Sequence, residues 1–436
     1  MSSQETNQSI AQNDLDYVFH SWSVQGQLKP MAFKTGKGCY LEDFEGKQYL
    51  DFSSQLVNTN IGHQHPKVVA AIKEQADLLT TIAPAHANKT RGLAAQKILE
   101  IAPKGFKKVF FTNAGADAVE NAIRMARIYT GRRKVLSAYR SYHGNTGVAI
   151  NTTGDARRFN NEYAQDHVHF FGPYLYRSEF WSQTEAEECE RALHHLRRIV
   201  ECENPAAIAC IILESVPGTA GVFVPPEGYV EGVRKLCDEF GIMLILDEVM
   251  VGFGRTGKWL AQEHYQGVVP DLITFAKGVN SGYVPAGGVI ISEKISDFFD
   301  DKMFPGGLTY SGHPLAMAAI VATIDAMREE GMVENAAKLG AEVLGPGLNA
   351  LAAKHNIVGE VRGLGLFWAI ELVSNSTTKE KFTPAQMGQV KNLCMEKGLV
   401  LFIAENRIHV APPLIVTAEQ IQQALKIFDE VLTAVA

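Results

Sequence analysis

Two short apolar runs, each followed by a charged residue, constrain the fold of this chain more than any other feature. The runs cover residues 243–246 and 272–275; Asp247 follows the first directly, and Lys277 follows the second after one alanine. Apolar runs of this length before a polar break are typical of strands buried on both faces of a parallel sheet. Ligands bind at the carboxyl ends of such strands. We therefore expect Asp247 and Lys277 to share a site at that edge of the sheet.

Strand-like and helical patterns alternate through the middle of the chain. The remaining strand-like runs lie at residues 108–112, 134–138, 167–171, 207–213 and 288–291, and helical stretches at 116–130, 185–202 and 229–240. Such alternation indicates a doubly wound sheet with helices on its faces. The sequence therefore predicts an α/β fold with a large, mostly parallel sheet.

The two ends of the chain have a different texture and predict a smaller α+β domain. A chain of 436 residues exceeds the size at which one core keeps growing, so a second domain is expected. We predict a flexible arm at residues 1–13, an N-terminal part of the small domain at 14–60, a large domain at 61–330 and the rest of the small domain at 331–436. A hairpin at residues 38–52 and a long helix over 332–353 are expected within these parts.

Charge and cysteine content exclude several classes of function. The formal net charge is -7, which argues against nucleic-acid binding, and no apolar stretch is long enough to span a membrane. The amino terminus lacks the pattern of a signal peptide, so a cytoplasmic location is expected. The six cysteines form no CxxC pair, which favours reduced, mostly buried thiols over a disulfide framework or a metal site.

Two places in the sequence could bind phosphate, and we favour the earlier one. Residues 252–257 match the dinucleotide pattern G-x-G-x-x-G, but three residues separate them from the strand, and Trp259 stands where a P-loop needs Ser or Thr. The strand at 108–112 instead leads through Gly115 and Ala116 into a helix. Small residues and a helix amino terminus suit an anion. An ordinary tight turn remains the alternative for Gly115 and Ala116.

The polar residues expected at the sheet edge fit one kind of ligand, a planar heteroaromatic phosphate that carries a carbonyl group. Tyr142 could stack on its ring, Asp247 could bond to a ring nitrogen, and Lys277 could form an imine with the carbonyl. Glu214 ends a further strand at the same edge. Buried charges at such positions are costly unless they are paired or functional. Pyridoxal 5′-phosphate (PLP) has this shape and is bound in this manner.

The order of motifs resembles the class III (ω-) aminotransferases of the fold-type I PLP enzymes. The matching segments are NAGADAVENA, YHG, LESV, LDEVMVGFGRTG, PDLITFAKG and TYSGHPLA, and the resemblance runs from about Phe19 to the carboxyl end. It implies a mostly parallel sheet of the seven-stranded type and a homodimer, or a tetramer, with active sites at the subunit interface. The cofactor residues that it implies are Gly115, Ala116, Tyr142, His143, Glu214, Asp247, Val249, Lys277 and Thr309.

The roles implied by the resemblance are specific. Lys277 would be the Schiff-base and catalytic residue, Val249 would lie under the cofactor ring opposite Tyr142, and Thr309 would reach the phosphate of the neighbouring subunit. The phosphate turn departs from the family's usual wording, because Ala116 and Asp117 replace a Ser and a Glu. We therefore expect backbone N–H groups to hold more of the phosphate.

The predicted reaction is a ping-pong transamination from an ω-amino acid or amine to a 2-oxo acid. We expect a pocket with an apolar lining and few charges and a donor resembling taurine, β-alanine or 6-aminohexanoate. Pyruvate is the expected acceptor, with glyoxylate and 2-oxoglutarate as alternatives. Arg407 is the candidate carboxylate anchor, with His409 at the family's more usual position and a surface role for Arg407 as the alternative. The other candidate substrate residues are Phe19, Trp22, Leu56 and Val57. A decarboxylase, racemase or aminomutase reaction, or a non-catalytic nucleotide-binding protein, are the competing hypotheses.

Overall fold

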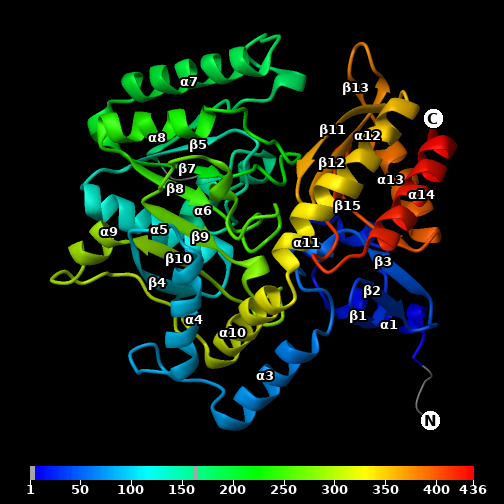
Figure 1. The fold of residues 1–436 in the computed structure, drawn as a ribbon, viewed down its shortest axis with the longest axis horizontal. Helices are drawn as coiled ribbons and strands as arrows, with labels where there is room; N and C mark the ends of the chain where they lie inside the picture. Colours follow the sequence, from blue (N-terminus) through cyan, green and yellow to red (C-terminus); the bar gives the residue numbers. More distant parts are fainter. Residues whose placement is uncertain (1–4, 162–164) are drawn as a thin grey trace.

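The computed structural model describes residues 5–161 and 165–436, which form two lobes (Figure 1). The larger lobe surrounds a seven-stranded sheet, in agreement with the sequence prediction. Its strands, in spatial order, are β4 (Phe106–Thr112), β10 (Gly287–Ser292), β9 (Leu272–Phe275), β8 (Met243–Asp247), β7 (Ile208–Glu214), β5 (Lys134–Ala138) and β6 (His167–Phe170). Only β10 runs antiparallel to its neighbours, and the other pairings within the sheet are parallel.

Both faces of this sheet are covered, which explains why its central strands are continuously apolar. Leu244 and Leu246 of β8 pack with helices α7 (Glu185–Cys202) and α8 (Tyr229–Phe240) on one face. Met243 and Ile245 pack with α5 (Gly115–Thr130) on the other. Each such side chain contributes roughly 1.5–3 kcal/mol by leaving water. The burial on both faces fixes the strand register, and with it the position of the residue that ends each strand.

Further helices complete the larger lobe. They are α3 (Pro66–Leu78), α4 (Lys89–Ile101), α6 (Gly147–Thr152), α9 (Glu293–Phe298) and α10 (Pro314–Glu329). The short helix α2 (Ser54–Val57) precedes them in the chain, and its Val57 packs with residues of both lobes. The amphipathic helices α3 and α4 pack against α10 at the lower end of the lobe in Figure 1.

The smaller lobe is built from both ends of the chain. The strands β1 (Phe33–Lys37), β2 (Tyr40–Asp43) and β3 (Gln48–Asp51) form one sheet with β14 (Leu399–Val400), which pairs with β3. The predicted hairpin at residues 38–52 is confirmed by β2 and β3. The remaining strands are β11 (Val358–Leu364), β12 (Phe367–Asn375), β13 (Glu380–Lys381), β15 (Phe402–Ala404) and β16 (Arg407–Val410), and the helices α13 (Pro384–Glu396) and α14 (Ala418–Val435) cover them. The exact domain boundaries stay predictions.

One predicted helix, over residues 332–353, is interrupted. The structure has α11 (Met332–Leu339), a π-helical turn at Gly340–Leu344 and α12 (Gly345–Lys354). A Cβ atom at Gly340 would lie 2.1 Å from the carbonyl oxygen of Gly365. The hairpin between β11 and β12 therefore approaches the helix backbone closely, and this contact is absent from any sequence pattern.

The amino terminus also differs from the prediction of a flexible arm at residues 1–13. Residues 1–4 lie outside the described part of the chain, but α1 (Asn7–Tyr17) is a helix with a capping box between Thr6 and Ser9. The side chain of Asn7 donates a hydrogen bond to Asp43 of β2 and accepts one from the Phe44 N–H. The capping box and the contact with β2 stabilise a helix in a segment whose polar composition predicted no regular structure. No helix among the described residues is long and apolar enough to cross a membrane.

Candidate active site

The strand ends bring Glu214, Asp247 and Lys277 to one edge of the large sheet. Glu214 is the register partner of Asp247 across β7 and β8, and Asp247 pairs with Thr274 of β9. Lys277 follows two residues after β9 ends, with a φ of 42°. A non-glycine residue in this left-handed region is strained, and strain of this kind concentrates at functional sites. The juxtaposition expected from the sequence is confirmed.

Asp247 is buried and held by three hydrogen-bond donors. Its Oδ1 accepts from Thr274 Oγ1 and from the Val249 N–H, both at 3.0 Å, and its Oδ2 lies 2.7 Å from His143 Nδ1. Because an ionised carboxylate can only accept, Nδ1 of His143 carries the proton in this arrangement. Asp247 is only 3% exposed and has no Lys or Arg partner among the described residues. The carboxylate is therefore fixed in direction and able to bind one more cationic donor.

The carboxylate of Glu214 is held by hydrogen bonds from two backbone N–H groups. It accepts from the N–H groups of Tyr142 at 3.1 Å and Gly218 at 2.8 Å. Burial, against the favourable charge of His143, raises the pKa of Glu214. The carboxyl therefore positions the Tyr142 backbone as well as facing the site.

Lys277 is the titrating group of the site. Burial lowers its pKa from 10.5 to about 8, although the carboxylates of Glu214 and Asp247 act in the opposite direction. A lysine with such a pKa is neutral in an appreciable fraction of molecules near neutral pH, and a neutral amine can act as a nucleophile or a base.

The amino terminus of α5 provides an anion cradle beside these residues. The N-cap residue, Ala114, has no side chain that could satisfy the N–H groups of the first turn, so they remain available to a ligand. A Cβ at Gly115 would lie 2.8 Å from Val249 Cγ1, and one at Gly144 would lie 2.6 Å from Ala116 Cβ. Only residues without side chains fit at these two positions. The uncapped N–H groups of this turn make it the candidate phosphate site.

The glycine-rich segment at residues 252–257 has a structural role. Arg255 within it is fully buried and donates to the carbonyl oxygens of Leu366 and Pro412 and to the side chains of Ser54 and Asn60. Burial lowers its pKa to about 9. The segment therefore ties the two lobes together through Arg255.

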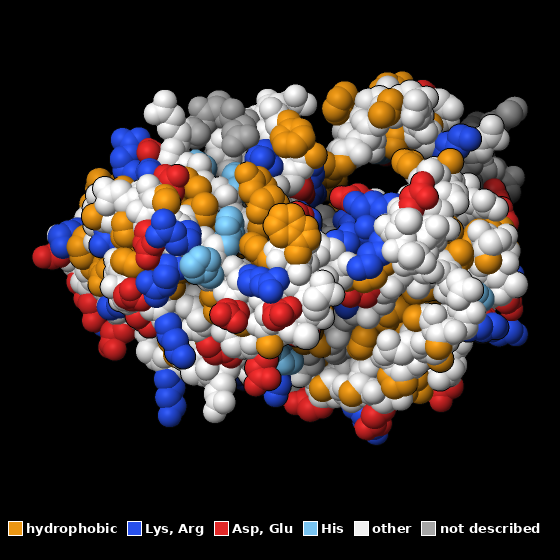
Figure 2. Space-filling model, turned by 90° about the horizontal axis from the view of Figure 1, so that it is seen from above, with side chains coloured by type: hydrophobic (Ala, Val, Ile, Leu, Met, Phe, Trp, Pro, Cys, Tyr) orange, Lys and Arg blue, Asp and Glu red, His pale blue; other side chains and the backbone are white. Residues whose placement is uncertain are grey.

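A cavity of about 820 Å³ opens between the lobes and contains the candidate substrate site (Figure 2). It is lined by Trp22, Leu56, Tyr142, Lys277 and Arg407, which the sequence singled out. Three other candidates do not line it. Phe19 is 87% exposed, Val57 is buried in a hydrophobic cluster, and His409 is buried with its Nε2 3.1 Å from the Gly218 carbonyl oxygen. Thr309 lies on the surface of the larger lobe.

The lining of the cavity is mostly apolar, as expected, but the expectation of few charges is wrong. Six cationic side chains line the cavity, against the carboxylates of Asp155 and Glu405. Blue side chains gather at the wall of the hollow in Figure 2. These cations come from separate strands and loops, so no local sequence pattern reveals that they converge. They are Arg140, Arg157, Arg177, Lys277, Lys381 and Arg407.

Arg407 has the properties of an anion anchor. Its Nη1 lies 3.2 Å from Glu405, and its buried Nε has no hydrogen-bond partner. Glu405 is shared, because Lys381 Nζ lies 2.8 Å from the same carboxylate oxygen. Burial would raise the pKa of Glu405, but the charges of Arg407 and Lys381 lower it to about 2. Two cations around one anion leave a net positive charge in this part of the cavity.

Sequence reasoning missed several residues of the site. Thr274 could have been noticed as the polar residue inside an apolar strand. Arg157 pairs with Asp155, and its guanidinium lies 3.6 Å from the centre of the Tyr142 ring. The two residues belong to a loop and a short helical turn with no motif, so their place beside Tyr142 depends on the fold alone.

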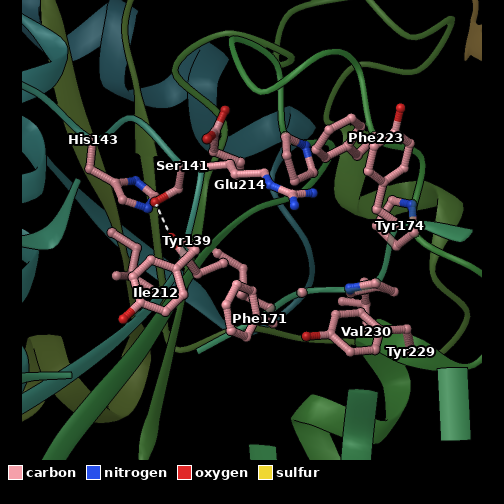
Figure 3. A pocket seen from close by; sticks show the side chains of 17 residues that line it. Tyr139, Ser141, His143, Phe171, Tyr174, Ile212, Glu214, Phe223, Tyr229 and Val230 are labelled. Carbon is pink, nitrogen blue, oxygen red and sulfur yellow. Dashed lines mark hydrogen bonds between the residues drawn. The ribbon is translucent and has the colours of Figure 1, made fainter. Parts of the chain in front are cut away.

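A small internal cavity of about 50 Å³ lies behind the sheet edge (Figure 3). His143 and Ile212 lie at one end of it in the figure, and Tyr174 and Phe223 at the other. The Nε2 atom of His143 is buried without a protein partner. Within the described residues, no group of three or more His, Cys, Asp or Glu side chains is arranged to hold a metal ion.

Comparison with known proteins decides the family. The family model described as "Aminotransferase class-III" matches residues 22–432. The chain belongs to the class III aminotransferase family. It is therefore a PLP-dependent aminotransferase, and its residues fit that cofactor. The α5 amino terminus would hold the phosphate, Tyr142 and Val249 would flank the ring, and Asp247 would face the ring nitrogen.

Individual relatives of this aminotransferase differ in substrate. A solved structure of taurine:2-oxoglutarate aminotransferase from Bifidobacterium kashiwanohense, in complex with PLP and glutamate, is 44% identical, with a TM-score of 0.95 over 99% of each chain. The 5-aminovalerate aminotransferase of Pseudomonas putida is 34% identical over 99% of this chain and 100% of its own. The hypotaurine/taurine–pyruvate aminotransferase of Paracoccus denitrificans is 31% identical over 97% and 96%.

Proposed function

We propose that this aminotransferase moves the amino group of an anionic ω-amino acid to a 2-oxo acid in ping-pong order. One observation carries the proposal: Lys277 and Arg407 line the same cavity, in which cationic side chains outnumber carboxylates. An amine that reacts at Lys277 and a distal anion that binds Arg407 can belong to one molecule. Arginine suits this task because its planar guanidinium binds a carboxylate or sulfonate through two parallel hydrogen bonds.

The roles of the chain's own groups follow from their contacts. When bound, PLP supplies an electron-accepting ring and an aldehyde that bonds to amines. Asp247, held by His143 and Thr274, would keep the ring nitrogen protonated, because a buried carboxylate favours a cationic partner. Lys277 Nζ would hold the cofactor, and its neutral amine would take up and return the proton that leaves the donor carbon. The lowered pKa of Lys277 supplies the neutral amine that both tasks need.

The charge of the cavity also bears on the acceptor. Pyruvate, the acceptor expected from the sequence, has one carboxylate, whereas 2-oxoglutarate has two. Arg157 beside Tyr142 and Arg407 on β16 offer two separate arginines in one cavity. This favours 2-oxoglutarate over pyruvate. The donor belongs to the class of taurine, β-alanine and longer ω-amino acids such as 6-aminohexanoate.

A donor and acceptor panel on the purified holoenzyme tests this proposal. Taurine, β-alanine and 6-aminohexanoate should each convert the bound cofactor to its aminated form, seen as loss of the near-visible absorbance. 2-Oxoglutarate should restore that absorbance faster than pyruvate. If donors release carbon dioxide or racemise without the spectral change, the enzyme is a decarboxylase or racemase and the proposal is wrong. A protein that stays colourless with PLP would refute enzyme function altogether.

We also propose a homodimer that completes the site. Tyr17, Phe19, Trp22, Met303 and Tyr310 are all more than 60% exposed, which is unusual for large apolar side chains unless a partner covers them. Thr309, adjacent to Tyr310, would then reach the neighbouring subunit's phosphate. Thr309→Ala should raise the Kd for PLP several-fold while sedimentation still gives a dimer. A monomeric protein with full activity would contradict the proposal.

A further inference from the structure

The stacked rings of Tyr174 and Phe223 form a wall shared by three cavities. Their centroids are 4.0 Å apart with an interplanar angle of 22°. Among the described residues, these two alone line the active-site cavity, the internal cavity of Figure 3 and an outer pocket of about 310 Å³. Two side chains, rather than the backbone of the sheet, therefore separate the active-site cavity from the other two cavities.

The wall is held rigidly from behind. The Tyr174 hydroxyl donates to Glu371 at 2.6 Å, and the Arg362 guanidinium lies 4.9 Å from the Tyr174 ring centre and 5.0 Å from that of Phe223. Arg362 is itself fixed by the Gly221 carbonyl oxygen at 2.7 Å and by Glu371. Both rings are only 8% exposed. A wall held in this way sets a definite limit to the space in front of it.

The space beyond the wall is mostly apolar. Beyond Phe223, the internal cavity is lined by Phe171, Ile212, Leu213 and Val230, and Arg140, His143 and Glu214 line it as well. The four apolar side chains would accept the methylene groups of a chain that passes the wall. We propose that the Tyr174–Phe223 stack limits the length of aliphatic chain that the active site accepts, and that Phe223 is its specificity-determining residue. The inference deepens the proposed function and rests on it for the identity of the substrate class.

Matched substitutions of phenylalanine test the role of the wall. Phe223→Ala joins the active-site cavity to the space behind it, and Phe223→Leu thins the wall while keeping most of its apolar surface. Phe171→Leu is the control, because Phe171 lines the internal cavity but not the active-site cavity. It loosens the same region by the same chemical change without breaching the wall. The leucine variants carry the test alone if the alanine variant does not fold.

Binding of straight-chain carboxylates to the holoenzyme gives a readout without turnover. Calorimetry from propionate to octanoate should show affinity rising by about fourfold per buried methylene group and then levelling off in the wild type. In Phe223→Ala the rise should continue, so that octanoate gains at least about tenfold over propionate relative to wild type. Phe223→Leu should give a smaller gain, and Phe171→Leu none. The kcat/KM ratio of 8-aminooctanoate to β-alanine should move in the same order.

Two outcomes would overturn the inference. One is an unchanged length preference in both Phe223 variants that bind PLP normally. The other is an equal shift in Phe171→Leu and Phe223→Leu, which would mean general loosening. Failure of the proposed function is distinguishable from failure of this inference. If the wild type transaminates no ω-amino acid but the wall acts as inferred, the calorimetric difference between Phe223→Ala and the wild type would still be observed.

Discussion

The two walls of the active-site cavity are stabilised in different ways. On the large-lobe side, Asp247 ends a strand that is buried on both faces, and its hydrogen bonds come from neighbouring strands and from His143. On the small-lobe side, Arg407 pairs with Glu405, which is 59% exposed and shared with Lys381. The first arrangement resists change because each group has a fixed partner. The second can exchange one anion for another, as binding of varied anionic substrates requires.

A neighbouring pair of carboxylates shows the same contrast at shorter range. Glu248, adjacent to Asp247, is fully buried and accepts from Ser215 and from the N–H groups of Ala261 and Gln262. Burial raises its pKa to about 7. All of these partners are structural, whereas Asp247 keeps room for a cationic ligand. Asp247 is the last residue of β8 and Glu248 is the first residue after it, so the same carboxylate chemistry meets two different environments at adjacent positions.

The largest effect is expected at Lys277. Lys277→Ala should reduce kcat by about 10⁴-fold or more, because it removes both the tether and the proton carrier. The near-visible absorbance should vanish with it. Lys258, an exposed lysine directly after the glycine-rich segment, is the control, and Lys258→Ala should leave both unchanged. Single-turnover half-reactions provide the measurement, and substantial activity in Lys277→Ala would refute its role.

The next effect separates the two carboxylates. Asp247→Asn should lower kcat by roughly 10²–10³-fold with little change in Tm, because the loss concerns charge placed at the reacting ring. Glu248→Gln should do the reverse, lowering the free energy of unfolding by about 1–3 kcal/mol through unsatisfied backbone N–H groups. Steady-state kinetics and thermal denaturation on both variants test this. If the two variants changed kcat and Tm equally, the assignment of a catalytic role to Asp247 and a structural role to Glu248 would be wrong.

The substrate wall should show a smaller effect that depends on charge. Arg407→Ala should raise KM for carboxylate and sulfonate substrates by roughly 10- to 100-fold, as expected for a charged hydrogen-bond partner. Neutral amines should be unaffected. Lys381→Ala, which removes a half-exposed cation from the same glutamate, should change KM less. Unchanged KM for every carboxylate in Arg407→Ala would show that another residue is the anchor.

The smallest effect concerns pH. Because burial lowers the pKa of Lys277 to about 8, its amine becomes neutral as pH rises through that value. PLP uptake by the apoenzyme should accelerate with pH and level off above about 8. Arg157 lowers this pKa further, so Arg157→Ala should move the curve to higher pH, and Arg197→Ala on the surface of α7 should not. Stopped-flow absorbance measures the rates, and a pH-independent rate would contradict the assignment.

Much of the large lobe could be predicted from local patterns. All seven strands lie within two residues of their expected bounds. For the four central strands, β7 to β10, the reason is that strands buried on both faces read as continuous apolar runs. Asp247 and Glu214 could be predicted for the same reason, since they end two of those strands, and Lys277 follows a third strand after one alanine. The π-helical turn at Gly340–Leu344 could not be predicted, because it accompanies a close contact between Gly340 and Gly365, which lie apart in the sequence.

The sequence by itself determined the sheet, the polar residues at its edge and the family. The tertiary structure alone decided which side chains face the substrate. His409 and Arg407 are two residues apart on one strand, yet one bonds to a buried carbonyl and the other lines the cavity. The convergence of six cations and the Tyr174–Phe223 wall likewise come from separate loops and strands. Strand ends follow from local hydrophobic periodicity, whereas the shape and charge of a cavity between two lobes depend on how those lobes pack.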